Sequence, residues 1–236
     1  MKRFWLILAV FLGLAATSAP AMADLQYTLD CKGDPCTGAN GGKNYGTVRL
    51  KQLGSGTVAD PYHVQVTVTL APGDVFLTTG GHSGFTWNLL GAINPTSVTV
   101  TSANSGLFQV QPFASPGTYG NSPFGDFEYA IENIDTHGNG GILGPLVFDI
   151  KVTGGLVLTN TLFSPNSNGY FFAADIGRDC TYTSGHYDCG SRTGVVASNT
   201  PPVRVPEPGT WMLSMAGLAG LAGLTMQRRR KLARAA

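Results

Sequence analysis

One short segment of the chain has the residue types of a serine nucleophile held at a sharp turn. Its residues are Gly81, His82, Ser83 and Gly84. In a nucleophile elbow one residue separates the serine from each of two flanking glycines, and a histidine with an attendant acid activates the hydroxyl. Here the second glycine follows the serine directly, and no such histidine is identifiable in the sequence. The segment therefore predicts a turn and no catalytic serine.

A second segment, 135–141, has the beginning of a calcium-binding pattern. Asp135, His137 and Asn139 place side chains that could bind a cation at alternate positions. An EF-hand loop also needs a glutamate at its twelfth position, where this chain has Leu146. We expect a glycine-rich turn here and keep weak calcium binding as the alternative.

Four side chains of the ligand type lie near the second pair of cysteines in the sequence. They are Asp175, Asp179, His186 and Asp188. Once the chain folds, they could form a metal or ligand site. The ordinary polarity of a surface loop explains them equally well, so we assign no metal ligand.

Carboxylates also recur along one predicted strand, as the pairs Glu128 with Glu132 and Asp126 with Glu128. Side chains at even spacing point to the same face of a strand, and two carboxylates on one face suit glycoside hydrolysis. The solvent-exposed face of any strand gives the same pattern. We therefore expect a non-enzymatic protein without catalytic residues or a cofactor. A secreted hydrolase is the least favoured alternative.

Aromatic side chains could bind carbohydrate, because flat apolar rings with a polar edge stack on the apolar faces of sugars. Trp87 is in phase with apolar neighbours at two-residue spacing, so we expect it in the core. Tyr119 is available. Tyr182 and Tyr187, which lie between the last two cysteines, are the better candidates for binding a ligand.

A two-residue alternation of apolar and polar residues predicts the strands that must position these groups. It is clearest over 62–70, 85–89, 127–131 and 146–152. Turn segments rich in glycine and proline separate the strands. Many short strands with such turns predict an all-β fold, an antiparallel β-sandwich formed by residues 24–204.

The distribution of charge argues against one class of partner. The span 24–205 contains 8 basic and 13 acidic residues, and the other basic residues lie near the two ends of the sequence. Binding to the phosphate backbone of nucleic acid needs a basic face. We therefore expect no nucleic-acid partner.

Residues 1–23 have the three parts of a secretory signal peptide. Lys2 and Arg3 precede an uninterrupted apolar run at 4–16. The cleavage pattern consists of Ala21 and Ala23, with Asp24 as the new N-terminal residue. We expect cleavage by signal peptidase and export of the chain. An uncleaved anchor is the alternative.

The four cysteines form two local pairs, Cys31 with Cys36 and Cys180 with Cys189. An even number of cysteines in an exported chain indicates disulfides. Of the three possible pairings we expect these two, because each closes a loop that contains turn residues. A zinc site formed by four thiolates is the alternative, although spacings of four and eight intervening residues differ from the usual short zinc-ligand spacings.

Residues 210–226 contain no charged side chain, and their number is at the lower limit for a membrane-spanning helix. A basic cluster follows, formed by Arg228, Arg229, Arg230 and Lys231. By the positive-inside rule, the basic tail stays in the cytoplasm and the domain before the helix lies outside. We expect one C-terminal transmembrane helix.

Pro206, Glu207 and Pro208 come just before this helix, and the two prolines fix an extended segment. Together with the Gly/Ala/Leu helix and the basic cluster, this segment resembles the PEP-CTERM sorting signal of exopolysaccharide-producing Gram-negative bacteria, over residues 205–231. The resemblance implies recognition of Pro-Glu-Pro by exosortase, a membrane-embedded processing enzyme with a cysteine nucleophile. It also implies that the helix and the basic cluster are a topological anchor, as in other removable C-terminal signals.

Segments inside the domain, above all 79–89 and 167–176, resemble other PEP-CTERM ectodomains of unknown function. Their similarity implies a shared fold and not an activity. We expect a structural or interaction protein that is first anchored in the inner membrane and then reaches the cell surface or the extracellular matrix. The alternative is a carbohydrate- or calcium-binding module, and exopolysaccharide is a candidate partner.

Overall fold

Strands account for nearly all the regular structure of this chain. The computed structural model describes residues 23–32, 44–91, 93–112, 118–134, 140–183, 186–190 and 192–206. Within these ranges the one helical element is a single 3-10 turn, η1 (Ser105–Leu107), and the sheets are antiparallel. The predicted all-β, antiparallel class is therefore confirmed.

The first sheet has six strands in the order β18-β1-β3-β4-β13-β7. In that order they are β18 (Val203–Val205), β1 (Asp24–Leu29), β3 (Gly46–Leu53), β4 (His63–Leu70), β13 (Leu146–Lys151) and β7 (Ser97–Val100). Strand β4 shows the predicted alternation, because Val64, Val66 and Val68 are buried and the residues between them are partly exposed. Its inner face therefore contributes a continuous apolar row to the core.

The second sheet is built around β14 (Phe172–Gly177), which is buried along its whole length. Its other strands are β5 (Val75–Phe76), β6 (Phe85–Trp87), β8 (Phe108–Val110), β11 (Tyr129–Asn133), β12 (Ile142–Leu143), β17 (Thr193–Ser198) and β2 (Cys31–Lys32). One edge of β14 pairs with β17 over its full length. The other edge pairs with β6 near its beginning and with β5 at its end. The chain between β5 and β6 therefore leaves the sheet and returns to it.

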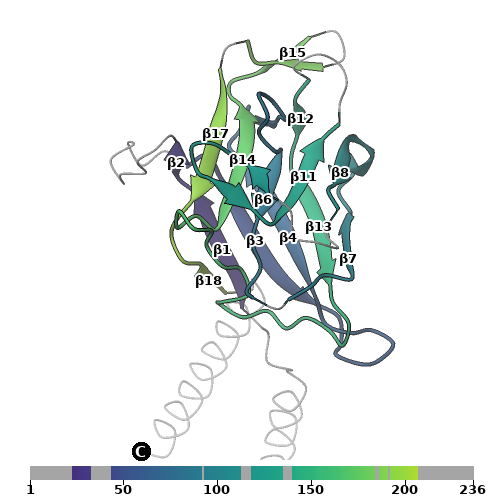
Figure 1. Cartoon of the computed structure of the whole chain (residues 1–236). Coiled ribbons are helices and arrows are strands. Elements are labelled where there is room, and N and C mark those ends of the chain that lie inside the picture. Colours follow the sequence, from purple (N-terminus) through teal and green to yellow (C-terminus); the bar gives the residue numbers. More distant parts are fainter. Residues whose placement is uncertain are drawn as a thin grey trace, which may run out of the picture. The chain divides into compact units, whose positions relative to one another are not determined.

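The two sheets share one hydrophobic core, and aromatic rings join them at its centre. Phe148 of β13 contacts Trp87 of β6, with ring centroids 4.9 Å apart, and Phe85 of the same strand at 6.0 Å. All three side chains are fully buried, as we expected for Trp87. In Figure 1, strands β14, β6 and β11 lie in front of β3 and β4. This arrangement is compatible with the predicted β-sandwich.

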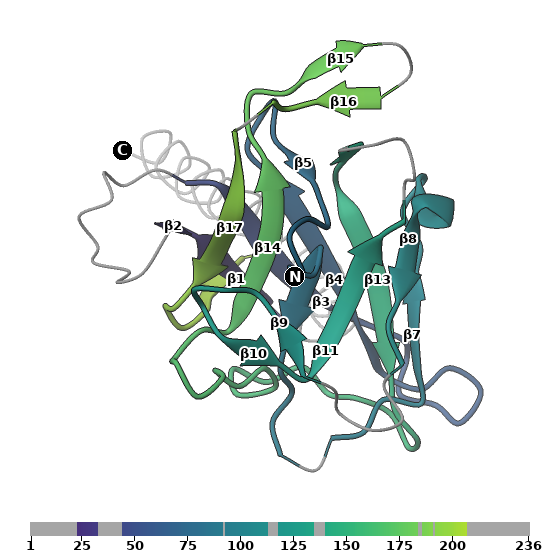
Figure 2. The same cartoon turned by 45° about the horizontal axis from the view of Figure 1, so that its top comes forward.

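The outer face of the second sheet is also covered. A short hairpin, β9 (Tyr119–Gly120) and β10 (Asp126–Phe127), places Phe124 and Phe127 in a separate apolar cluster with side chains of β14 and β17. Asn121 donates a hydrogen bond to the Thr86 hydroxyl at 2.8 Å, where both side chains are buried. Figure 2 shows this hairpin next to the lower parts of β14 and β11. Both faces of the second sheet are therefore in contact with protein.

Several predicted elements lie outside the described residues. They include the signal peptide up to residue 22, Cys36, most of the glycine-rich segment 135–141, and the chain from Glu207 through the predicted helix 210–226 to the basic cluster. In the ranges that the structure covers, no helix combines the length and the apolar character needed to cross a membrane.

Candidate functional site

The loop formed by residues 77–84 connects β5 and β6, which pair with the same edge of β14 in the middle of the second sheet. Both of its ends bond to the same residue of β14, because Leu77 donates to the carbonyl of Asp175 and the Asp175 N–H donates to Gly84. At its tip the His82 N–H donates to the carbonyl of Thr79 at 2.8 Å. The two central residues of this turn are glycines with φ of 59° and 82°. These positive angles are those of a type I′ turn, which glycine adopts without strain.

The carboxylate of Asp175 holds this loop from below. Its Oδ2 accepts hydrogen bonds from both the backbone N–H and the hydroxyl of Thr79, each at 2.7 Å. The residue is fully buried, and within the described structure its Oδ1 has no hydrogen-bond partner. Burial raises the pKa of this carboxyl, the Thr79 bonds and nearby His82 oppose that shift, and Glu132 adds to it.

Glu132 of β11 holds the same loop from its other side. Its Oε2 accepts hydrogen bonds from the Thr78 hydroxyl and from the Gly84 N–H, both at 3.0 Å. The neighbouring Asn133 donates to the carbonyl of Phe76, at the end of β5, at 3.1 Å. Two carboxylates from different strands therefore fix the 77–84 loop. One of them, Glu132, belongs to the carboxylate pairs singled out in the sequence.

A polar pocket of about 250 Å³ opens between the tip of this loop and the β9–β10 hairpin. Its lining residues are Gly80, Gly81, His82, Gly120, Ser122, Pro123, Gly125 and Asp126. The two walls are joined directly, because the Ser83 N–H donates to the carbonyl of Gly120 at 3.2 Å. Half-buried His82 and exposed Asp126 are the titratable side chains of this lining. The pocket offers donors and acceptors without a strong net charge.

Ser83 does not stand in the geometry of an activated nucleophile. It is buried, and within the described ranges no hydrogen bond links its hydroxyl to a histidine. The segment forms a turn followed by the start of β6, as the spacing of its glycines predicts. The turn places His82 in the lining of the pocket.

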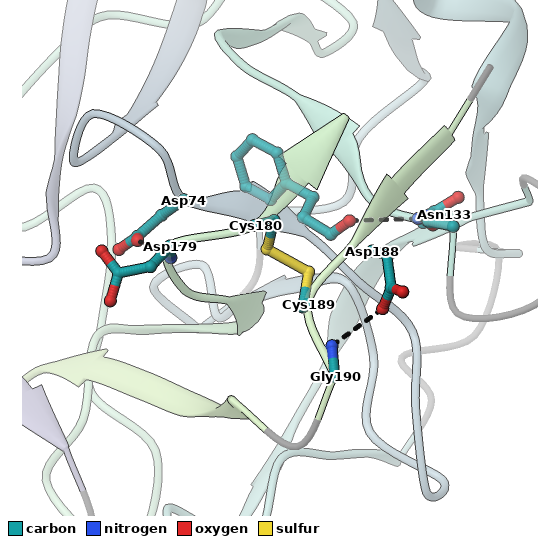
Figure 3. Close-up of a disulfide and its surroundings, with 9 residues drawn as sticks. Asp74, Asn133, Asp179, Cys180, Asp188, Cys189 and Gly190 are labelled. Carbon is teal, nitrogen blue, oxygen red and sulfur yellow. Dashed lines mark hydrogen bonds between the residues drawn. A yellow bond between two sulfur atoms is a disulfide. The ribbon is translucent and has the colours of Figure 1, made fainter. Parts of the chain in front are cut away.

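The acidic residues predicted near the second cysteine pair do not come together as a group. Asp175 lies under the 77–84 loop, whereas Figure 3 shows Asp179 and Asp188 beside the disulfide and away from each other. Asp188 accepts a hydrogen bond from the Gly190 N–H at 2.9 Å. The side chain of His186 is outside the described residues. Nowhere in the described ranges do three His, Cys, Asp or Glu side chains gather as they would around a metal ion.

The predicted disulfide between Cys180 and Cys189 is confirmed. Its Cα atoms are 4.2 Å apart, and Figure 3 shows it where β14 leads into the next hairpin. Cys31 is also disulfide-bonded, and Cys36, its predicted partner, lies outside the described residues. A Cβ atom added to Gly177 would lie 2.1 Å from the sulfur of Cys189. The end of β14 therefore packs directly on the disulfide, which only a glycine allows.

This disulfide closes the base of the hairpin formed by β15 (Thr181–Thr183) and β16 (His186–Asp188). Tyr182 and Tyr187 are cross-strand partners with ring centroids 5.1 Å apart. Tyr187 packs on the apolar cluster of Val75 and Leu77, whereas Tyr182 is 64% exposed. The other candidate, Tyr119, donates a hydrogen bond from its hydroxyl to the carbonyl of Pro112. Of the three tyrosines, Tyr182 has the most accessible ring.

The raised pKa of Asp175 predicts a specific pH dependence of stability. A carboxyl whose folded-state pKa exceeds its unfolded value stabilises the fold fully below the unfolded pKa, about 3.9 for aspartate. That contribution is lost as the pH rises through the folded-state pKa. Asp175→Asn keeps an oxygen for the Thr79 bonds and removes the titration. As the pH rises from below about 3.9 through the raised folded-state pKa, wild type should therefore lose stability relative to this variant.

Urea unfolding of both proteins across this pH range measures the effect. The Asp60→Asn variant, which removes an exposed carboxylate of a surface loop, controls for the general loss of one negative charge. A stability difference between wild type and Asp175→Asn that stays constant with pH would contradict the prediction.

Comparison with known proteins finds a match for the C-terminal segment of the sequence. Residues 204–231 match the family model of the PEP-CTERM protein-sorting motif, which includes all seven residues predicted to direct sorting. No curated protein and no solved structure matches the chain. Of the matched residues, exposed Pro206 directly follows β18, and those from Glu207 onward lie outside the described residues. The chain therefore carries a PEP-CTERM sorting signal, and this signal implies export and sorting by an exosortase-type enzyme.

Proposed function

We propose that this chain is a non-enzymatic structural or interaction protein of the cell envelope or extracellular matrix. The observation that carries the proposal is that two neighbouring carboxylates, Asp175 and Glu132, serve a structural purpose. Asp175 and Glu132 both accept hydrogen bonds from the 77–84 loop and hold its backbone in place. A hydrolase would need such groups free to exchange protons with a substrate.

The sorting signal supports delivery to the envelope in two steps. The uncharged segment 210–226 and the basic cluster behind it stop and orient the chain in the inner membrane. Pro206, Glu207 and Pro208 then present a rigid extended segment with one negative charge, which the processing enzyme recognises. The mature domain is released to the cell surface or the matrix.

A carbohydrate-binding module is the second candidate function. It is favoured by the exposed ring of Tyr182, which is supported by Tyr187 on a disulfide-closed hairpin. A ring held in this way loses little conformational freedom when it stacks on a sugar. Calcium binding by 135–141 stays a prediction, because most of that segment lies outside the described residues.

Replacing Pro206, Glu207 and Pro208 with alanine tests the sorting step. Export should continue, because the apolar segment and the basic cluster suffice to stop and orient the chain. Processing should fail, and the precursor should accumulate in the inner membrane. Cell fractionation and the intact mass of the protein measure both effects.

The matched control replaces Pro201 and Pro202, which precede the matched segment 204–231. This control should be processed like wild type. Identical mature mass and fractionation for wild type and the Pro-Glu-Pro variant would show that the tail is a simple membrane anchor.

A hydrolase screen tests the non-enzymatic function. We expect the exported protein to release no product from glycoside, ester or peptide substrates. Any turnover is checked with Glu132→Gln, which keeps the shape of the side chain. Turnover that this variant abolishes while its melting temperature is retained would overturn the proposal.

For the second candidate, we expect Tyr182→Ala to remove whatever binding wild type shows on a glycan array, because stacking needs the exposed ring. Tyr62→Ala is the matched control, since Tyr62 is 38% exposed and lies outside the β15–β16 hairpin. Equal loss of binding in both variants would argue against a site on the hairpin.

A further inference from the structure

We propose that the polar pocket between the 77–84 loop and the β9–β10 hairpin binds one neutral sugar ring or a polyol of similar size. This proposal deepens the proposed function and rests on it in one respect, that the protein binds its ligand without converting it. The site is separate from the exposed ring of Tyr182, which is not among the residues lining the pocket.

Both walls of the pocket are held in place before any ligand arrives. Asp175 and Glu132 fix the loop wall through four hydrogen bonds of 2.7–3.0 Å. On the hairpin wall, the Asn166 amide donates to the carbonyls of Phe124 and Asp126 at 2.9 and 3.2 Å. A site that is ordered in advance loses less entropy on binding, so weak individual contacts to a small ligand add up.

The glycines of the lining leave backbone groups accessible. Gly80, Gly81 and Gly125 have positive φ, which the turns require, and none of them covers its own peptide groups with a side chain. At Gly125 a Cβ would also lie 2.6 Å from the amide nitrogen of Asn168. At the exposed Gly80–Gly81 turn, peptide groups therefore supplement the side chains as partners for hydroxyls, whereas the Gly125 carbonyl already accepts a hydrogen bond from the Asn121 N–H.

The side chains of the lining match a neutral ligand with several hydroxyls. The carboxylate of Asp126 accepts hydrogen bonds, and the imidazole nitrogens of His82 can bond to hydroxyls. Ser122 adds a hydroxyl, and Pro123 contributes the one aliphatic ring to this lining. Adjacent hydroxyls of a sugar donate and accept at once, so they can bond to both kinds of group.

Charged ligands fit this lining less well. An anion would meet the carboxylate of Asp126 in the lining. Behind the loop lies the carboxyl group of Asp175, which interacts electrostatically with both His82 and Glu132. A hard cation prefers six or more oxygen ligands, and the part of the chain described by the structure holds no cluster of three metal-binding side chains. The volume of about 250 Å³ is below that of most pockets for drug-sized ligands, so one ring fits better than an oligomer.

The test is a titration of the isotope-labelled protein, as the cell exports it, with methyl pyranosides and inositol. The methyl glycosides of glucose, galactose, mannose and N-acetylglucosamine cover the common hydroxyl arrangements. We expect at least one probe to bind at millimolar concentration and to shift the amide resonances of Gly80, Gly81 and Gly125. Asp126→Asn replaces the charged acceptor with a neutral amide, and His82→Gln replaces the imidazole with a differently shaped side chain, so each should weaken binding roughly fivefold.

Asp179→Asn and His63→Gln are matched controls, because both residues lie outside the pocket and the substitutions are the same in kind. Binding of no probe by the folded wild-type protein would overturn the proposal. So would shifts confined to the β15–β16 hairpin, or binding that both pocket variants retain. Because the mapping uses wild type, it remains decisive if a variant fails to fold. Cleavage of a glycoside during the titration would instead overturn the non-enzymatic function and leave the ligand class intact.

Discussion

A carboxyl group buried on the outer face of strand β14 anchors the 77–84 loop to the second sheet. Removing a carboxylate from water is costly unless hydrogen bonds replace the lost hydration. Asp175 receives two such bonds from Thr79, one from its backbone N–H and one from its hydroxyl, each at 2.7 Å. Together with the two Glu132 bonds and the backbone bonds at the ends of the loop, they hold the 77–84 loop over β14, beside the pocket.

Alternation in the sequence predicts the strands that have one face in the core and one in solvent. Strands β4 and β13 belong to this kind, and Trp87 was correctly expected in the core. Strand β14 gives only a weak signal, because both of its faces are buried and a small residue, Ala173, fills the outer one. The alternation over 127–131 also predicts one continuous strand, yet the strand is interrupted at Glu128. As a result, Phe127 packs on the outer face of the second sheet and Tyr129 packs in the core.

The candidate site was harder to predict, since it depends on contacts between segments far apart in the sequence. Asp175 is close in sequence to Cys180, which suggested a polar cluster around the disulfide, whereas pairing of β14 with β5 and β6 directs it toward Thr79. The segments 79–89 and 167–176, which the sequence singled out, meet at this contact through the hydrogen bonds between Thr79 and Asp175.

The same hydrogen bonds bear on the choice between binding and catalysis. General acid-base chemistry changes the protonation of a carboxylate in every cycle. At Glu132 such a change would weaken the bonds that hold Thr78 and Gly84, and the loop wall of the pocket would loosen during each turnover. Recognition of a neutral ligand by His82 and Asp126 requires no such change. A fixed loop wall is consistent with the binding of a neutral ligand proposed above, and the matched sorting motif lies apart from it in the sequence, at residues 204–231.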